Sequence, residues 1–472
     1  MSSTTVIRGG QVVLPQAAVA ADLLIAGETI GAVLAPGAEV PAGTRVIDAA
    51  GCLVFPGVVD PHTHIQLDTG IYQTPDDWEI GTRTAAFGGV TTAIDFATQF
   101  PGMTFEQALE ARLAECAPAI IDYALHMMVT ELPRDEAEAR RWLEALRDSG
   151  VPSIKLYTTY RPNYYADDAT LLHTFRAMPR DMIAMLHCEN DALVTDATAR
   201  LVESGRTSWA YHGQARPPEA EVEAIRRVLY LAQVAGAAVY IVHCSTAESI
   251  RVVDEARRQN DVPPIYCETC PQYFWLDDSR YAAPDAEQFI LQPPLRPAAW
   301  QVDLLDAAPA LNAVSTDHCD YTIAQKREFP DFTKTPGGLP GLETSFALTY
   351  TFAVHRARER QQAGEPVRPI SLPELARLMA GDPARLFGLW PRKGALLPGS
   401  DADVLIYDPA PQVTIRARDQ HTIAGYTPYA GMTVQGRVRT ILSRGEVIVD
   451  EGRLLGEPGR GRFLPGAPFA AP

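Results

Sequence analysis

The sequence is short of positive charge and has no long apolar run. Lys and Arg together number 41 against 58 Asp and Glu, which gives a formal net charge of −17. Nucleic acids and anionic membrane surfaces are bound through basic patches, so this balance argues against both as partners. No stretch approaches the roughly 18 uninterrupted apolar residues that a transmembrane helix needs. These two shortages exclude nucleic-acid binders and membrane-spanning proteins.

Cysteine is too scarce to form a disulfide framework. Seven cysteines, an odd number, are spread over 472 residues, unlike the dense and even sets of small secreted proteins. The opening residues, Met-Ser-Ser-Thr-Thr-Val-Ile-Arg, lack the charged segment and apolar stretch of a secretion signal. A hydrophobic fraction of 46% excludes wholesale disorder. We therefore expect a folded, soluble, cytoplasmic protein.

The length predicts one large domain with a smaller partner. Between residues 56 and 390, short apolar runs alternate with longer amphipathic stretches, which is typical of βαβ units around a parallel sheet. Eight strands are predicted there, the number in a (β/α)₈ TIM-type barrel. They cover residues 58–60, 91–96, 122–129, 153–157, 184–187, 239–243, 265–267 and 313–315.

Both ends of the chain instead show short strands with tight turns. Neither end is long enough to bury a core alone, so we expect residues 1–55 and 391–472 to form one small β-sandwich domain. Residues 456–472, rich in Gly, Pro and Ala, are expected to be a tail or a packing arm. The predicted strands at the two ends cover residues 5–7, 11–14, 22–26, 29–33 and 45–48, and residues 403–407, 412–415, 432–435, 438–443 and 446–449.

Histidines and an aspartate follow several of the predicted barrel strands. His62 and His64 are two residues apart after the first strand, so in an extended segment their side chains face the same side. His187, His243 and Asp317 each stand at the end of a later strand, where this fold gathers its catalytic residues. Any one of them could be a hydrogen-bonded rim residue, but the five together favour a metal site.

Lys155 lies within the predicted strand 153–157, where a charged amine carries a large desolvation penalty. Its stem could be buried while its head reaches solvent at the strand end. Alternatively, burial keeps the amine deprotonated and able to add CO₂, and the carbamate (N6-carboxylysine) bridges two metal ions. Oxygen and imidazole ligands together suit Zn²⁺ best, with Mn²⁺, Co²⁺ or Fe²⁺ as alternatives.

The order His-x-His, Lys, His, His, Asp resembles that of the binuclear-metal amidohydrolases. The surrounding residues resemble one group of them, the dihydropyrimidinase and hydantoinase family of cyclic amidohydrolases. The resemblance runs nearly end to end. It rests on the segments Pro56-Gly57-Val58-Val59-Asp60-Pro61-His62-Thr63-His64, His187-Cys188-Glu189-Asn190, Ala215-Arg216-Pro217-Pro218-Glu219-Ala220-Glu221, Thr316-Asp317-His318-Cys319, Gly338-Leu339-Pro340-Gly341-Leu342-Glu343-Thr344, Gly399-Ser400-Asp401-Ala402-Asp403 and Gly431-Met432-Thr433-Val434-Gln435-Gly436.

The resemblance implies an enzyme in which a metal-bridging hydroxide opens a hydantoin or dihydropyrimidine ring to an N-carbamoyl amino acid. Tyr160 would hydrogen-bond the substrate carbonyl and the developing oxyanion, and Asp317 would pass the hydroxide proton to the leaving nitrogen. A homotetramer is the implied assembly. The implied ligands are His62, His64 and Asp317 for the more buried metal, and His187 and His243 for the more exposed one, bridged by carboxylated Lys155.

The substrate pocket is less readable from the sequence. Leu67, Tyr157 and Tyr164 fall where hydantoinases place apolar lid residues, which implies an aromatic-lined pocket, although all three could be ordinary rim residues. Two positions depart from the family pattern. Gln292 precedes Pro-Pro-Leu-Arg where the family has serine, and Gly337 precedes Gly-Leu-Pro-Gly where the family has asparagine. Both positions usually offer backbone groups to the ring, so binding is expected to survive. A glutamine side chain could still narrow or redirect the choice of ring.

Two alternatives stay open. The ring could be allantoin, a cyclic imide or a lactam, whereas dihydroorotate is disfavoured because no basic pair to clamp its carboxylate is identifiable. The chain could also be a non-catalytic scaffold such as the collapsin-response mediator proteins, which share the fold and have lost metal ligands. All six ligand positions are filled here, which argues against a scaffold.

Overall fold

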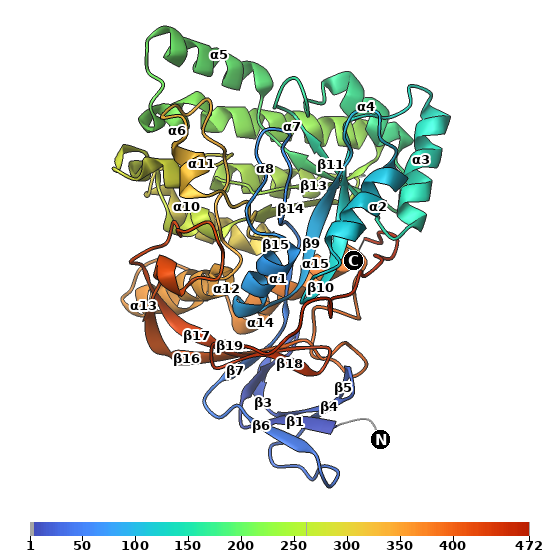
Figure 1. Cartoon of the computed structure of the whole chain (residues 1–472), viewed down its shortest axis with the longest axis vertical. Coiled ribbons are helices and arrows are strands. Elements are labelled where there is room, and N and C mark those ends of the chain that lie inside the picture. Colours follow the sequence, from blue (N-terminus) through green and yellow to red (C-terminus); the bar gives the residue numbers. More distant parts are fainter. Residues whose placement is uncertain (1–3, 261, 472) are drawn as a thin grey trace.

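The computed structural model describes residues 4–260 and 262–471. An eight-stranded parallel sheet forms a barrel in the upper part of Figure 1, and two smaller sheets lie below it. Residues 1–3 and 472, the outermost parts of the two predicted end segments, lie outside the described residues, as does residue 261.

The barrel strands follow one another around the sheet in chain order, from β8 to β15. All neighbouring pairs are parallel, and a helical connection between most of them returns the chain to the same end of the barrel. The predicted (β/α)₈ TIM-type barrel is therefore confirmed. The strands are β8 Val58–Asp60, β9 Val90–Thr98, β10 Asp122–Met128, β11 Ser153–Tyr157, β12 Ile183–His187, β13 Ala238–Ile241, β14 Ile265–Thr269 and β15 Ala313–Val314.

Amphipathic helices pack outside the barrel (Figure 1). Helix α3 is an example: the Asp135 side chain caps its first turn, and Ala139, Leu143 and Leu146 form its buried stripe. The α-helices are α1 Trp78–Phe87, α2 Phe105–Glu115, α3 Glu136–Asp148, α4 Asp168–Ala177, α5 Asp191–Glu203, α6 His212–Ala215, α7 Pro218–Ala235, α8 Ala247–Arg257, α9 Pro271–Trp275, α10 Trp300–Ala307, α11 Ile323–Arg327, α12 Ser345–Thr349, α13 Ala357–Gln362, α14 Leu372–Ala376 and α15 Asp382–Leu386. Short 3₁₀ segments cover Trp209–Tyr211, Asp278–Ala282, Ala286–Phe289, Ala308–Ala310 and Ala417–Asp419, and π-helical turns cover Tyr350–Arg356 and Arg377–Gly381.

Both chain ends contribute to one of the smaller sheets. The four-stranded sheet has the order β5-β4-β1-β6, and the seven-stranded sheet has the order β19-β18-β17-β16-β7-β2-β3. Strand β7 pairs with β2 on one side and with β16 on the other, so N-terminal and C-terminal strands lie side by side (Figure 1, blue and red). The strands are β1 Thr4–Arg8, β2 Gln11–Val13, β3 Ala18–Ala20, β4 Asp22–Ala26, β5 Thr29–Leu34, β6 Arg45–Asp48, β7 Leu53–Pro56, β16 Val404–Thr414, β17 Thr433–Ser443, β18 Glu446–Asp450 and β19 Arg453–Leu454.

The C-terminal strands are fewer and longer than predicted. The predicted strands 403–407 and 412–415 form the single strand β16, and 432–435 and 438–443 form β17. The register between β16 and β17 shifts between Asp408 and Gln412. Pro409 and Pro411 fall in this interval, and since proline has no N–H to donate, the ladder is interrupted by an irregularity and not by a turn. Strands β3, β7 and β19 were not predicted.

The C-terminal segment packs along the barrel. Tyr123 N donates to Arg462 O over 3.0 Å, and Leu464 N donates back to Tyr123 O over 2.7 Å. The side chains of Leu464 and Phe469 are buried in one cluster with barrel residues. This segment is therefore a packing arm.

Lys393 joins the smaller sheets to the barrel. Its buried Nζ lies 2.7 Å from Asp122 Oδ2 on β10, 2.7 Å from Asp403 Oδ2 and 3.0 Å from Asp401 Oδ2. A buried ammonium needs such partners to offset its lost hydration. The ion pairs therefore tie the chain just before β16 to β10, the third strand of the barrel.

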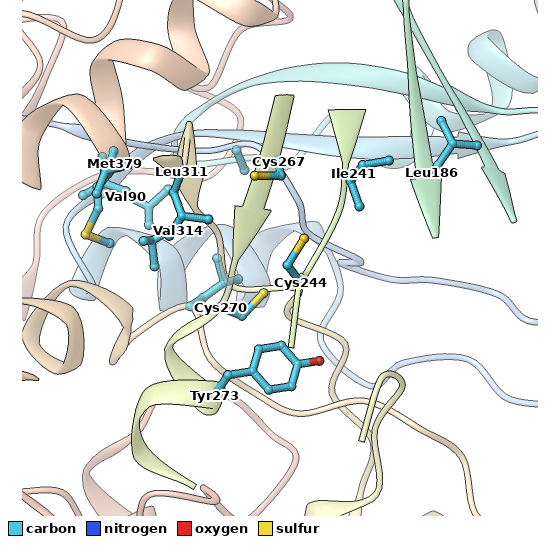
Figure 2. Close-up of a cluster of buried hydrophobic side chains, with 14 of the residues drawn as sticks. Val90, Leu186, Ile241, Cys244, Cys267, Cys270, Tyr273, Leu311, Val314 and Met379 are labelled. Carbon is cyan, nitrogen blue, oxygen red and sulfur yellow. The ribbon is translucent and has the colours of Figure 1, made fainter. Parts of the chain in front are cut away.

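The cysteines pack as small apolar residues. All seven are buried and free of disulfides. Figure 2 shows Cys244, Cys267 and Cys270 beside Ile241 and Val314, at the carboxyl ends of neighbouring strands. Among the described residues, no helix is both long enough and apolar enough to cross a membrane.

Candidate metal centre

The first and last barrel strands meet where the site forms. His64 N donates to His318 O over 2.7 Å, and Asp317 N donates to His62 O over 3.0 Å. Thr63 and His318 form a parallel bridge between the same segments. These backbone contacts bring His62, His64 and Asp317 side by side, although they lie at opposite ends of the barrel sequence.

His62, His64 and Asp317 form the first ligand set. Asp317 Oδ1 lies 3.2 Å from His62 Nε2 and 3.3 Å from His64 Nε2. In a tetrahedral zinc site with bonds of about 2.0–2.1 Å, neighbouring donor atoms are separated by about 3.3 Å. The donor atoms and their spacing therefore fit a divalent cation.

His187 and His243 form the second set. His187 is the last residue of β12, and its Nδ1 lies 2.9 Å from Nε2 of His243, two residues beyond β13. The His62 and His243 rings stack with centroids 5.5 Å apart, so the two sets are neighbours. His187 and His243 are buried, whereas His64 and Asp317 are half-buried. Burial of the side chains alone therefore does not rank the two sets in the order that the family resemblance implies.

Lys155, on β11, lies beside both sets. Its Nζ is 3.2 Å from His62 Nε2, and the residue is only 1% exposed. The rings of Phe96 and Tyr157 enclose the amine, with centroids 5.2 Å and 5.3 Å from Nζ. Burial lowers the pKa of Lys155 to about 8, which makes a neutral amine accessible near neutral pH.

Two carboxylates that were not predicted from the sequence orient the histidines. Glu268 Oε1, on β14, lies 2.5 Å from His62 Nδ1, and Tyr240 donates to Glu268 Oε2 over 2.8 Å. Glu189 Oε2 lies 2.8 Å from His187 Nε2. Each carboxylate accepts the N–H of one ring nitrogen and leaves the other nitrogen's lone pair for a metal. Glu268 could have been predicted as a functional residue, because it is an ionisable residue directly after the predicted barrel strand 265–267.

Burial also sets the protonation of the ligands. It lowers the pKa of His62, His187 and His243, so these imidazoles are neutral and can offer a lone pair. Burial opposes ionisation of Asp317 as well, but its contacts with His62 and His64 outweigh that effect and lower the pKa of Asp317. The donor set is therefore in the form that binds a cation.

The ligand residues line a cavity of about 650 Å³. Tyr160 has φ +75°, a left-handed conformation that side chains rarely adopt, and its ring centroid is 4.9 Å from that of His187. Burial raises the pKa of Tyr160, which keeps its phenol protonated. Ile71, Tyr72 and Phe329 also line the cavity and were not predicted. All six residues expected to bind substrate are in the lining: Leu67, Tyr157, Tyr160, Tyr164, Gln292 and Gly337.

A second buried group of potential ligands, Asp76, His318 and Asp320, lies next to this site. His318 Nδ1 accepts a hydrogen bond from Gly341 N over 3.1 Å, so in the neutral ring the proton is on Nε2. That nitrogen lies 3.5 Å from Asp320 Oδ1 and 4.0 Å from Asp76 Oδ2. A protonated nitrogen cannot bind a metal, so His318 in this form offers no ligand atom to a cation at this group.

Comparison with known proteins agrees with the geometry. Residues 53–448 match the amidohydrolase family. The chain is 37% identical over 484 residues to a D-hydantoinase of Streptomyces coelicolor, covering 99% of each chain. It is 40% identical over 434 residues to a D-phenylhydantoinase of Escherichia coli O1:K1, covering 90% of each. The crystal structure of a dihydropyrimidinase from Brevibacillus agri superposes with a TM-score of 0.92 at 34% identity, covering 99% of this chain and 100% of the other.

The contact between Glu268 and His62 generates a prediction. Glu268→Gln is expected to weaken metal binding by about 10- to 100-fold, because a neutral amide accepts the His62 N–H less strongly and can also turn its NH₂ group toward the ring. Metal content after equilibration with a graded chelator measures the change. Glu248→Gln, on the exposed face of α8, is the matched control. Equal metal retention by Glu268→Gln and the control would remove Glu268 from the metal centre.

Proposed function

The chain belongs to the amidohydrolase family, and we propose that within it the protein opens hydantoin rings that carry an aromatic substituent at carbon 5. It is a metal-dependent hydrolase of cyclic amides. The observation that carries the proposal is the convergence of two imidazole-containing ligand sets and Lys155 on one cavity. The names of the relatives, D-hydantoinase and D-phenylhydantoinase, support the D-enantiomer as the preferred substrate.

The proposed ligands are His62, His64 and Asp317 for one metal and His187 with His243 for the other. Two bound divalent cations, with Zn²⁺ preferred and Mn²⁺ or Co²⁺ as alternatives, supply Lewis acidity that polarises the ring carbonyl and lowers the pKa of water. The contacts to the substrate and the proton transfers come from side chains of the chain itself.

Tyr160 is the proposed donor to the substrate carbonyl. Its phenol stays protonated because burial raises its pKa, and its ring lies against His187 at the edge of the second ligand set. Negative charge develops on the carbonyl oxygen when water attacks, so a fixed donor in a buried cavity stabilises the transition state more than the ground state.

Asp317 is the proposed proton carrier. Its Oδ1 contacts both His62 and His64, which leaves Oδ2 to take a proton from the attacking water. The same atom then gives the proton to the ring nitrogen as the carbon–nitrogen bond breaks. A water oxygen is added, the ring nitrogen gains a hydrogen, and the product is an N-carbamoyl amino acid.

The apolar part of the cavity is the proposed site for the ring substituent. Leu67, Tyr157 and Tyr164 line it together with Ile71 and Tyr72. Aromatic side chains bury large apolar areas and pack against aryl groups, so they favour 5-aryl over unsubstituted rings. Ile71 is 81% exposed, so its side chain has apolar surface left for a ligand to cover.

Lys155 is the proposed bridge between the two metals, as N6-carboxylysine. An ammonium 3.2 Å from His62 Nε2 would repel a cation on that nitrogen, whereas a carbamate would attract it. The neutral amine adds CO₂, forms a carbon–nitrogen bond and releases one proton. The lowered pKa of Lys155 supports this step, because only the neutral amine reacts.

Assembly and compartment are also proposals. The family resemblance favours a homotetramer, and the exposed Tyr230 and Val234 on α7 offer apolar surface for subunit contacts. Seven cysteines without a disulfide support a reducing compartment, the cytoplasm. The scaffold alternative is not favoured, since all six ligand residues line the same cavity.

A substrate panel tests the proposed function. We expect the highest kcat/KM for D-5-phenylhydantoin, lower values for L-5-phenylhydantoin and dihydrouracil, and the lowest for allantoin and succinimide, because only the aryl hydantoin fills the aromatic part of the cavity. Purified protein is expected to contain about two metal equivalents, and chelation is expected to abolish ring opening. A preference for allantoin or succinimide, or less than one metal equivalent in active protein, would contradict the proposal.

Replacing Lys155 tests the carbamate. Lys155→Ala is expected to lose ring-opening activity because the bridge is missing, and short carboxylic acids such as acetate are expected to restore part of it. Native mass spectrometry of the protein without substitutions should detect one added CO₂ per chain. The Lys155→Ala variant should lack this added mass. Full activity of Lys155→Ala without a carboxylic acid would refute the bridging role.

Replacing Tyr160 tests the oxyanion donor. Tyr160→Phe is expected to lower kcat about 10²-fold, the scale for one donor to an oxyanion, with unchanged metal content. Tyr211→Phe, on the outer 3₁₀ segment, is a control outside the cavity lining. If kcat is the same in both variants, Tyr160 has no part in the chemical step.

A further inference from the structure

Gln292 and Gly337 occupy one space in the cavity wall. Both line the cavity. A Cβ atom built on Gly337 would overlap Oε1 of Gln292 and lie 2.5 Å from its Cδ and Nε2. The φ of Gly337 lies outside the left-handed region, so its backbone alone would accept a side chain. The carboxamide of Gln292 therefore fills the place that a side chain at position 337 would take.

The backbone holds these two segments in register. Gly338 N donates to Ile290 O over 3.0 Å. The Nζ of Lys326, which is fully buried, donates to the same Ile290 oxygen over 2.9 Å and to Gly338 O over 2.6 Å. Gln292 stands two residues from the Ile290 anchor, and Gly337 stands one residue from the Gly338 anchor. The backbone positions from which Gln292 and Gly337 face each other are thus set by the fold around Lys326.

We propose that the side-chain amide of Gln292 is a specificity-determining group that recognises the ureide edge of the ring, and that glycine at 337 is what makes room for it. This inference rests on the proposed function for the identity of the ring. In the resembling family the two positions carry serine and asparagine, so an amide side chain has moved from one segment to the other. With the carboxamide of Gln292 placed as it is, a Cβ atom at 337 would meet it, and glycine at 337 leaves that space to the carboxamide.

The chemistry of a carboxamide defines the preferred ring. The amide carries N–H donors and a carbonyl acceptor side by side in one plane. A hydantoin or dihydropyrimidine offers the complement, a carbonyl next to a ring N–H, in the part of the ring beyond the broken bond. A lactam has no second carbonyl, so it would leave part of the amide without a partner on the ring. The expected class is therefore cyclic ureides in preference to lactams.

The first experiment removes the hydrogen-bonding groups and keeps the volume. Gln292→Leu is expected to raise the KM for dihydrouracil about 10-fold with kcat nearly unchanged, because the contact exists in both the ground state and the transition state. The inhibition constant of 2-piperidone, a lactam, should stay the same. Gln233→Leu, on the exposed face of α7, is the control. An unchanged KM, or an equal loss for the ureide and the lactam, would overturn recognition by the amide.

The second experiment tests the exchange itself by a double-mutant cycle. Gly337→Asn alone is expected to lower both kcat/KM and the melting temperature, because the new side chain meets Gln292. In the Gln292→Ser background the same change should be tolerated, with kcat/KM at least about 10-fold above that of Gly337→Asn alone. Equal damage in both backgrounds would overturn the exchange.

Kinetic constants and melting temperatures together distinguish a failure of this inference from a failure of the proposed function. If the unmodified protein opens none of the rings in the panel, the proposed function fails and recognition of a ureide falls with it. The coupling between positions 292 and 337 is still measured by the melting temperature, which needs no substrate. Coupling in the melting temperature then supports the exchange, and its absence overturns it.

Discussion

Burial of ionisable side chains at the carboxyl end of the barrel is the constraint on which the site depends. Burial lowers the pKa of Lys155 and of the imidazoles of His62, His187 and His243, and it raises that of the Tyr160 phenol. These shifts differ in sign because burial always disfavours the charged form, whichever form that is. One physical cause therefore gives an amine that can react, imidazoles that can bind a cation and a phenol that can donate. No separate adjustment of each residue is needed.

The buried lysines show how the neighbours of a cation decide what it does. The chain has four lysines, and Lys155, Lys326 and Lys393 are all 1% exposed or less. Lys393 has three carboxylates around it and serves as a charged link between the barrel and the smaller sheets. Lys326 has two backbone carbonyls and joins two cavity segments. Lys155 contacts an imidazole, and the nearby carboxylates of Asp317 and Glu268 favour its charged form less than burial disfavours it. The resulting lowered pKa supports its proposed conversion to an anion.

The sequence allowed prediction of what depends on local pattern and much less of what depends on long-range register. The eight barrel strands follow from apolar runs, and the candidate ligands follow from their places at the ends of those strands. Strand β7 was not predicted because its apolar run directly precedes β8, and no polar residues separate the two strands. The role of Glu268 was not predicted because its partner, His62, follows a strand that is distant in the sequence. Only the closed barrel brings β8 and β14 close together. The close approach of Gln292 and Gly337 could not be predicted for the same reason. In the sequence, each residue is only a separate departure from the family pattern.

Closure of the barrel and assembly of the candidate ligand set His62, His64 and Asp317 are one event in this chain. The backbone hydrogen bonds that join the segments after β8 and β15 involve His62, His64 and Asp317 themselves, so their side chains converge only when the first and last strands meet. A cation bound by these three residues would in turn hold the two segments together, because binding to the folded state alone shifts the folding equilibrium toward it. The barrel therefore needs no additional device to keep its ends in register at this rim, and the ligands need no flexible loop to bring them together. The site lies at the seam of the barrel, and the same backbone contacts close the barrel and bring its residues together.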